Sequence, residues 1–274
     1  MYKFDLKYSD LNTFTEELKY KCRIDIKSFT EGAAKRIIGG FMDAHKVSSV
    51  HDLINWINAN PRNKDEFMKA IIPNKTEFFR DPGLWRFLEV ELPKIVKSQG
   101  SVKVLDLGAS SGQEVYSFSI MVNNLKLNKQ VELVAVEKFQ IKINQMLEGI
   151  YNDKEFESCE NNYSRFKIGK SFGEFVSRES GVFKLKEEYI TPIQTKQYDL
   201  VNDRAFGEFD IVLCRNVMCY ISLKKARPVY KSLSDFTKKN GYLVLGVQED
   251  LSNSFFNRDF NCVNEEFKVY QKVR

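Results

Sequence analysis

Four short apolar runs alternate with helical patterns in the second part of the chain and limit the folds open to it. The runs cover residues 102–107, 131–136, 210–213 and 242–247. Helical spacing of apolar residues follows the first run, and a further helix is predicted around residues 141–147. Strands that are apolar on both faces and alternate with helices are typical of a parallel sheet covered by helices. We therefore predict an α/β fold with a doubly wound, mostly parallel sheet.

The first part of the chain follows a helical pattern throughout. Apolar residues recur at helical spacing, as at Leu11, Phe14 and Leu18, and no alternating run rich in Val and Ile interrupts residues 11–70. We therefore predict a small all-helical domain over residues 1–72. A linker over residues 73–83 then leads into a larger domain over residues 84–274.

Residues 152–190 break the alternation of strands and helices inside the larger domain. The segment is polar, and Gly169, Gly173 and Gly181 separate short stretches in which aromatic and polar residues alternate. Alternation with period two is typical of strands, so we predict a small β insertion here.

Composition excludes several classes of protein. Hydrophobic residues make up 43% of the 274 residues, which suits a packed core and not a disordered chain. No apolar run approaches the roughly 18 residues of a membrane span, so we expect no membrane insertion. The net charge of +5 is spread among acidic residues, whereas a nucleic-acid surface shows a dense basic stripe. With two His and no CxxC pair among five Cys, we expect no metal site and free thiols in the cytoplasm.

The segment 209–221 places polar residues directly after a buried strand. Arg215 and Asn216 follow the apolar residues 211–213. Because ligands of open α/β sheets bind outside the carboxyl ends of the strands, these two residues predict a binding site. Tyr220 follows four residues later and is placed to turn its hydroxyl toward the same edge. The alternative is a strand end whose polar residues only satisfy loop backbone.

A turn of small residues, 108–112, follows the strand 102–107. Small residues between a strand and a helix let the backbone approach a ligand at the helix start, although the spacing is not a dinucleotide fingerprint. Glu114 opens the helix and disfavours a phosphate there. Glu137 ends the next strand, where an acidic residue accepts hydrogen bonds from ribose hydroxyls. S-adenosylmethionine fits this pattern, because it is a nucleoside with cationic sulfonium and ammonium groups and no phosphate.

The segment 74–81 lies between the two predicted domains. Its polar residues Asn74, Thr76 and Arg80 are interleaved with Phe78 and Phe79. They are candidates for a site at the junction. The alternative is that they cap a helix and hold its start with a hydrophobic staple.

The three segments occur in an order that closely resembles the CheR family, the chemotaxis receptor methyltransferases. Their sequences are Asn-x-Thr-x-Phe-Phe-Arg-Asp, Ala-Ser-Ser-Gly-Gln-Glu-x-Tyr-Ser and Phe-Asp-x-x-x-Cys-Arg-Asn-Val-Met-x-Tyr. The resemblance spans nearly the whole chain and implies a class I methyltransferase-like fold. It also implies an enzyme, an S-adenosylmethionine-dependent protein-glutamate O-methyltransferase, that yields receptor glutamate methyl esters and S-adenosylhomocysteine.

The resemblance further implies which residues form the site. Arg80 and Tyr220 are implied as catalytic, with Tyr220 near the transferring methyl group. Asp199 and Leu200 are implied beside the adenine. Together with Gly108 from the turn, the expected cofactor-binding residues are Asn74, Thr76, Arg80, Gly108, Glu114, Glu137, Asp199, Leu200, Arg215 and Asn216.

The partners implied are the cytoplasmic domains of chemotaxis receptors, and we expect a cytoplasmic monomer. The chain departs from the family at Gln113, Val115, Glu137 and Asp199, where Glu, Pro, Asp and Asn are usual. These departures leave open a regulatory protein that binds the cofactor or receptor with little turnover. A methyltransferase for another protein substrate is the other alternative.

Overall fold

The computed structural model describes residues 8–22, 24, 26, 29–71, 76–252 and 254–274. They fall into two compact units. The first comprises Met1–Asn74 and Met218–Ala226, and the second comprises Lys75–Val217 and Arg227–Arg274. The domain limits given by the sequence pattern stay predictions, because residues 72–75 lie outside the described part.

The first unit is helical, as the fold prediction requires. Its helices are α1 (Tyr8–Cys22), α2 (Glu31–His45), α3 (Val50–Ala59) and α4 (Pro61–Ile71). Thr30 caps α2 by accepting a hydrogen bond from the Ala33 amide at 3.2 Å. Phe41 and Phe67 meet edge to face with ring centroids 5.1 Å apart, so aromatic packing joins α2 to α4.

The second unit is built on a sheet that confirms the predicted α/β class. Within the described residues the sheet has seven strands in the order β6-β2-β1-β7-β8-β10-β9. Neighbouring strands are parallel except at β10, which runs antiparallel to β8 and β9. The strands are β1 (Val102–Leu107), β2 (Val131–Glu137), β6 (Ile193–Gln197), β7 (Phe209–Cys214), β8 (Thr237–Leu245), β9 (Phe260–Asn264) and β10 (Val269–Lys272).

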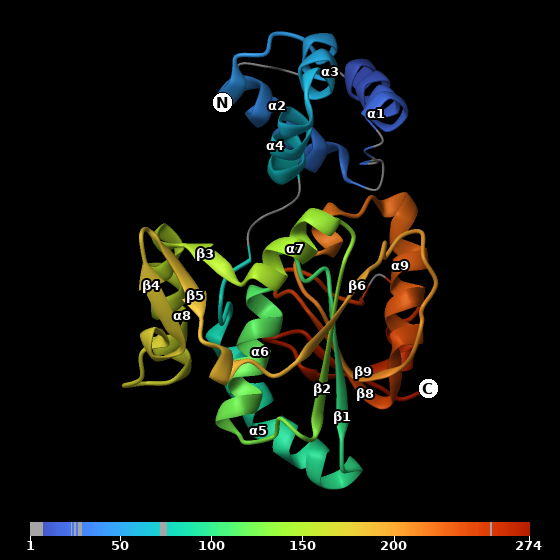
Figure 1. Cartoon of the computed structure of the whole chain (residues 1–274). Helices are drawn as coiled ribbons and strands as arrows, with labels where there is room; N and C mark the ends of the chain where they lie inside the picture. Colours follow the sequence, from blue (N-terminus) through green and yellow to red (C-terminus); the bar gives the residue numbers. More distant parts are fainter. Residues whose placement is uncertain (1–7, 23, 25, 27–28, 72–75, 253) are drawn as a thin grey trace. The chain divides into compact units, whose positions relative to one another are not determined.

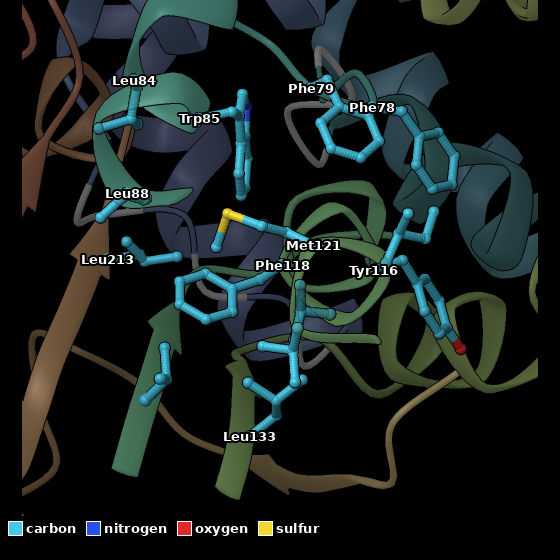
Figure 2. Close-up of a cluster of buried hydrophobic side chains, with 14 of the residues drawn as sticks. Phe78, Phe79, Leu84, Trp85, Leu88, Tyr116, Phe118, Met121, Leu133 and Leu213 are labelled. Carbon is cyan, nitrogen blue, oxygen red and sulfur yellow. The ribbon is translucent and has the colours of Figure 1, made fainter. Parts of the chain in front are cut away.

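Helices cover both faces of this sheet, with α5 and α6 on one side and α9 on the other (Figure 1). They are α5 (Pro82–Gln99), α6 (Gln113–Asn124), α7 (Gln140–Glu148) and α9 (Leu223–Phe236). Trp85 of α5 and Phe118 of α6 lie in the apolar layer against Leu213 of β7 (Figure 2). This layer fixes the start of α6 over the ends of the parallel strands.

The predicted β insertion is present and also contains a helix that the sequence pattern did not indicate. Its three strands, β3 (Ile150–Asn152), β4 (Val176–Glu179) and β5 (Val182–Leu185), form an antiparallel sheet in the order β3-β5-β4. The helix is α8 (Phe156–Phe166).

Short 3-10 helices occur both inside and outside the insertion. They are η1 (Asp153–Glu155), η2 (Phe172–Phe175), η3 (Glu187–Tyr189), η4 (Met218–Tyr220) and η5 (Asn257–Asp259).

Aromatic packing anchors the insertion to the segment that precedes α5. The Phe172 ring lies 4.9 Å from that of Phe78 and 6.4 Å from that of Phe79. Phe79 also stacks on Phe166 of α8 at 5.2 Å. The two phenylalanines of segment 76–81 are therefore core residues (Figure 2), and they hold the flanking polar residues Glu77 and Arg80 in place.

We expect Phe172→Ala to lower the free energy of unfolding by about 3–5 kcal/mol, because Phe172 is fully buried and its loss leaves a cavity. Chemical denaturation followed by far-UV circular dichroism measures this change. The matched control is Ile168→Ala in the same insertion, where the side chain is 94% exposed and the expected change is within about 0.5 kcal/mol. Equal effects at the two positions would contradict the packing described.

Candidate functional site

The candidate site lies at the edge of the sheet where the parallel strands end. Strands β6, β2, β1, β7 and β8 are mutually parallel, so their carboxyl ends meet at one edge. Sequence-predicted residues follow these ends. Gly108 comes after β1, Glu137 closes β2, Asp199 and Leu200 follow β6, and Arg215 and Asn216 follow β7.

The turn after β1 has a backbone that only small residues accommodate. Gly108 has φ +80°, and a Cβ there would lie 2.8 Å from the Val217 side chain. Gly112 has φ +93° and begins α6. The Ser110 amide donates to Glu137 Oε2 at 3.0 Å, which ties the turn to the end of β2. The backbone of the turn before α6 is therefore fixed.

Arg215 connects three segments at this edge. Its side chain is 1% exposed, and its guanidinium forms ion pairs with Glu114 at the start of α6 and with Asp81 before α5. One of its nitrogens also donates to the Arg80 carbonyl at 3.3 Å. The structure thus brings together Arg215 and Glu114, two of the predicted site residues, and places Arg80 beside them.

The segment 76–81 is held from several sides. The Phe79 amide donates to Ser117 Oγ of α6 at 2.8 Å, and Trp85 Nε1 donates to the Arg80 carbonyl at 2.9 Å. Asp81 is the N-cap of α5, yet within the described residues its carboxylate makes no capping hydrogen bond and instead pairs with Arg215. Thr76 is half-buried. Asn74 lies outside the described residues.

The carboxyl groups of Asp106 and Glu114 lie near Arg215. Burial raises the pKa of Asp106 well above its usual range, and the charge of Glu114 raises it further. Burial also raises the pKa of Glu114, against the opposing charge of Arg215. Among the described residues, Asp106 Oδ2 and Arg215 Nε are buried atoms without a hydrogen-bond partner. The site therefore combines carboxyl groups whose charged form burial disfavours with unsatisfied polar atoms.

Glu137 is buried, and both of its oxygens accept backbone hydrogen bonds. Oε1 accepts from the Phe139 amide at 3.1 Å and Oε2 from Ser110. Burial raises the pKa of Glu137, while these amides and the charge of the buried Lys142 oppose that rise. The Glu137 side chain, which is longer than the Asp usual at this position, reaches the turn after β1. Each of its oxygens can still accept a further hydrogen bond.

Asp199 and Leu200 lie beside the end of β2. Asp199 pairs with Lys138, with 3.1 Å between Nζ and Oδ2, and accepts a hydrogen bond from the Val201 amide at 2.9 Å. Burial raises the pKa of Asp199, but Lys138 and the Val201 amide outweigh it and the pKa is lowered. Asp199 thus stays ionised and shapes the turn that carries Leu200.

Tyr220 belongs to the other compact unit. The Thr30 amide donates to the Tyr220 carbonyl at 2.9 Å, and the Tyr220 ring lies 6.3 Å from that of Phe29. The segment 218–226 is therefore part of the helical unit, and the predicted proximity of Tyr220 to the reacting methyl group stays a prediction.

Two residues that sequence reasoning missed belong to this edge. Asp81 follows Arg80 directly, and its position before Pro82 is typical of a helix cap. Glu249 lies in the turn after β8 and accepts hydrogen bonds from the Asn216 amide at 2.9 Å and the Gly246 amide at 2.8 Å. The sequence could have indicated Glu249, because it is an acidic residue just beyond a buried strand.

The chemistry of these side chains fits a cationic nucleoside. A positive ligand would stabilise the charged form of these carboxyl groups, whereas a phosphate would oppose it. An acidic group at the end of β2 beside a turn of small residues fits a ribose. Among the described residues no group of three or more His, Cys, Asp or Glu is arranged to hold a metal ion.

Comparison with known proteins identifies the family. Residues 74–269 match the family model "CheR methyltransferase, SAM binding domain". The chain belongs to this family. The resemblance to CheR proteins seen in the three sequence segments is therefore confirmed, and with it a domain for S-adenosylmethionine.

Curated relatives match over almost their whole length. A chemotaxis protein methyltransferase of Listeria innocua is 24% identical over 242 residues, which cover 88% of this chain and 89% of that protein. Chemotaxis protein methyltransferase 1 of Pseudomonas aeruginosa is 24% identical over 256 residues, 89% and 91% of the two chains. Among solved structures, the N-methyltransferase NodS of Bradyrhizobium japonicum matches with a TM-score of 0.32 and 15% identity, covering 61% and 63% of the chains.

Within the described part of this CheR-family chain, every helix is too short or too polar to cross a bilayer.

The buried Asp106 predicts how stability depends on pH. A carboxyl whose folded pKa is raised stabilises the fold below its unfolded pKa of about 3.9, and this contribution is lost as pH rises through the folded pKa. Asn cannot ionise, so Asp106→Asn should raise the free energy of unfolding relative to wild type, by an amount that grows from pH 4 upward. Urea denaturation at pH 4, 5, 6, 7 and 8 measures the difference. A constant difference across this range would contradict the burial of an ionisable Asp106.

Proposed function

We propose that this CheR-family chain transfers the methyl group of S-adenosylmethionine to glutamate side-chain carboxylates of chemotaxis receptors. The products are glutamate methyl esters and S-adenosylhomocysteine. The observation that carries the proposal is the group of carboxyls at this edge of the sheet, which suits a cationic nucleoside without phosphate. They are the buried Asp106 and Glu137 at the strand ends and Glu114 in the first turn of α6, which pairs with Arg215. The names of the relatives, chemotaxis protein methyltransferases, support the receptor as substrate.

The proposed cofactor contacts follow from the chemistry of each residue. Glu137 accepts from the ribose hydroxyls, and Asp199 and Leu200 border the adenine. Glu114 and Asp106 face the cationic methionine part. The other proposed contacts are Asn74, Thr76, Arg80, Gly108, Arg215 and Asn216.

The nucleophile needs no general base. A glutamate carboxyl with a pKa near 4.3 is about 99.8% ionised at pH 7. S-adenosylmethionine, when bound, supplies an already activated methyl group on its sulfonium. The protein therefore has to align the carboxylate in line with the methyl group and exclude water.

We assign two residues to this alignment. Arg80 orients a carboxylate, of cofactor or substrate, through charge-assisted hydrogen bonds. Its charge acts at the site, since it lowers the pKa of Glu114 against the rise from burial and alongside Arg215. Tyr220 orients the nucleophile or packs against the methyl group.

The test is incubation with methyl-labelled S-adenosylmethionine and receptor-bearing membranes of the source cell, followed by mild base. The proposal predicts label on protein of receptor size that base releases as volatile methanol. Base-stable label would contradict glutamate esters and indicate another substrate group. Cofactor binding without labelling would contradict turnover and favour a regulatory protein.

Arg80→Ala should reduce methyl transfer by about 10–100-fold, because a charge-assisted hydrogen bond contributes about 1.5–3 kcal/mol. Arg80→Lys should recover only part of this rate, since Lys lacks the planar guanidinium fork. Initial rates at saturating and limiting cofactor measure both variants. Arg258→Ala, at an exposed position, is the matched control and should keep the wild-type rate. Full activity of Arg80→Ala would show that Arg80 has no such role.

A further inference from the structure

The turn after β8 lies beside the turn after β7. Cys214 of β7 is in register with Leu245 of β8, so Asn216 and Gly246 follow neighbouring strand ends. Asn216 has φ +57°, in the left-handed region that Asn tolerates better than most residues. This backbone conformation needs support from neighbouring groups to persist.

Glu249 provides that support with a single oxygen. Its Oε2 accepts from the Asn216 amide at 2.9 Å and from the Gly246 amide at 2.8 Å. The Glu249 amide in turn donates to the Gly246 carbonyl at 2.8 Å, which closes the turn. Glu249 is 7% exposed, so these are charge-assisted hydrogen bonds in a site with little water.

Gly246 leaves space for this arrangement. A Cβ at position 246 would lie 2.8 Å from both the amide nitrogen and the side-chain Nδ2 of Asn216, and 2.9 Å from Glu249 Oε2. The Asn216 side chain therefore lies directly against the backbone of the turn after β8. Its direction depends on Gly246 and Glu249 together.

We propose that Glu249 is a positioning residue for S-adenosylmethionine, which acts by fixing the backbone and side-chain direction of Asn216. This proposal rests on the proposed function, because it takes Asn216 as a cofactor contact. Glu249 is proposed to act through Asn216 and not to contact the cofactor itself. Without its carboxylate, two buried amides lose their acceptor and Asn216 leaves the left-handed conformation.

The test is isothermal titration calorimetry of the full chain with S-adenosylhomocysteine. Glu249→Leu should weaken affinity by about 10-fold or more, whereas Glu249→Gln should stay within about 3-fold, because a Gln oxygen can accept the same two hydrogen bonds. If Glu249→Leu fails to fold, Glu249→Asp replaces it. Asp keeps the charge but withdraws the carboxylate by one methylene, and affinity should again fall.

Asp210→Leu is the matched control. Asp210 is 3% exposed on the same strand, β7, but at its opposite end, where Oδ2 accepts from the Lys103 amide at 2.8 Å. Its loss should lower stability and leave affinity unchanged. An equal loss of affinity in Asp210→Leu and Glu249→Leu would overturn the proposal, because it would indicate general destabilisation.

A double-mutant cycle tests the route through Asn216. If Glu249 acts through Asn216, the variant with both Asn216→Ala and Glu249→Leu should bind no more weakly than Asn216→Ala alone. Additive losses would overturn the proposal, as would wild-type affinity in a folded Glu249→Leu. Wild-type protein that binds no S-adenosylhomocysteine would contradict the proposed function instead.

Discussion

The site depends on the buried guanidinium of Arg215, whose positive charge has to be paired with carboxylates inside the protein. Arg215 has almost no exposure, and a buried charge is tolerated only when it is paired and hydrogen-bonded. Asp81 and Glu114 meet that requirement, so the segment before α5, the start of α6 and the end of β7 are brought together. Asp106 and Glu137 add further buried carboxyls at the same edge. Burial raises the pKa of Asp106, Glu114 and Glu137, so a cationic ligand at this edge would stabilise their charged forms.

Much of the fold could be predicted from the sequence because the central strands are buried on both faces. Strands β1, β2, β7 and β8 read as continuous apolar runs for that reason. Strand β6, with the sequence IQTKQ, lies at an edge and is partly exposed, so it has no such run. Helix α9 was also missed, since it contains Pro228 and a polar, basic sequence.

Several residues of the candidate site stand out in the sequence, but the contacts that join them do not. Arg215, Glu114 and Glu137 stand out because each lies at a strand end or helix start. The contacts between them do not stand out, since an ion pair such as that of Arg215 with Glu114, over 100 positions apart, leaves no local pattern. Asp81 has the sequence position of a helix cap, and only the tertiary structure reveals that it pairs with Arg215. Phe78 and Phe79 show the converse, because residues within a site motif serve as the core of the insertion.

We expect the buried carboxyl groups at the strand ends to select a cationic nucleoside without phosphate. Calorimetric titration of the full chain with S-adenosylmethionine and, separately, with ATP tests it most directly, because both carry adenosine and differ in the charge attached to it. We expect saturable binding of S-adenosylmethionine and no detectable heat of binding with ATP. Binding of ATP with equal or greater affinity, or no binding of S-adenosylmethionine, would contradict it.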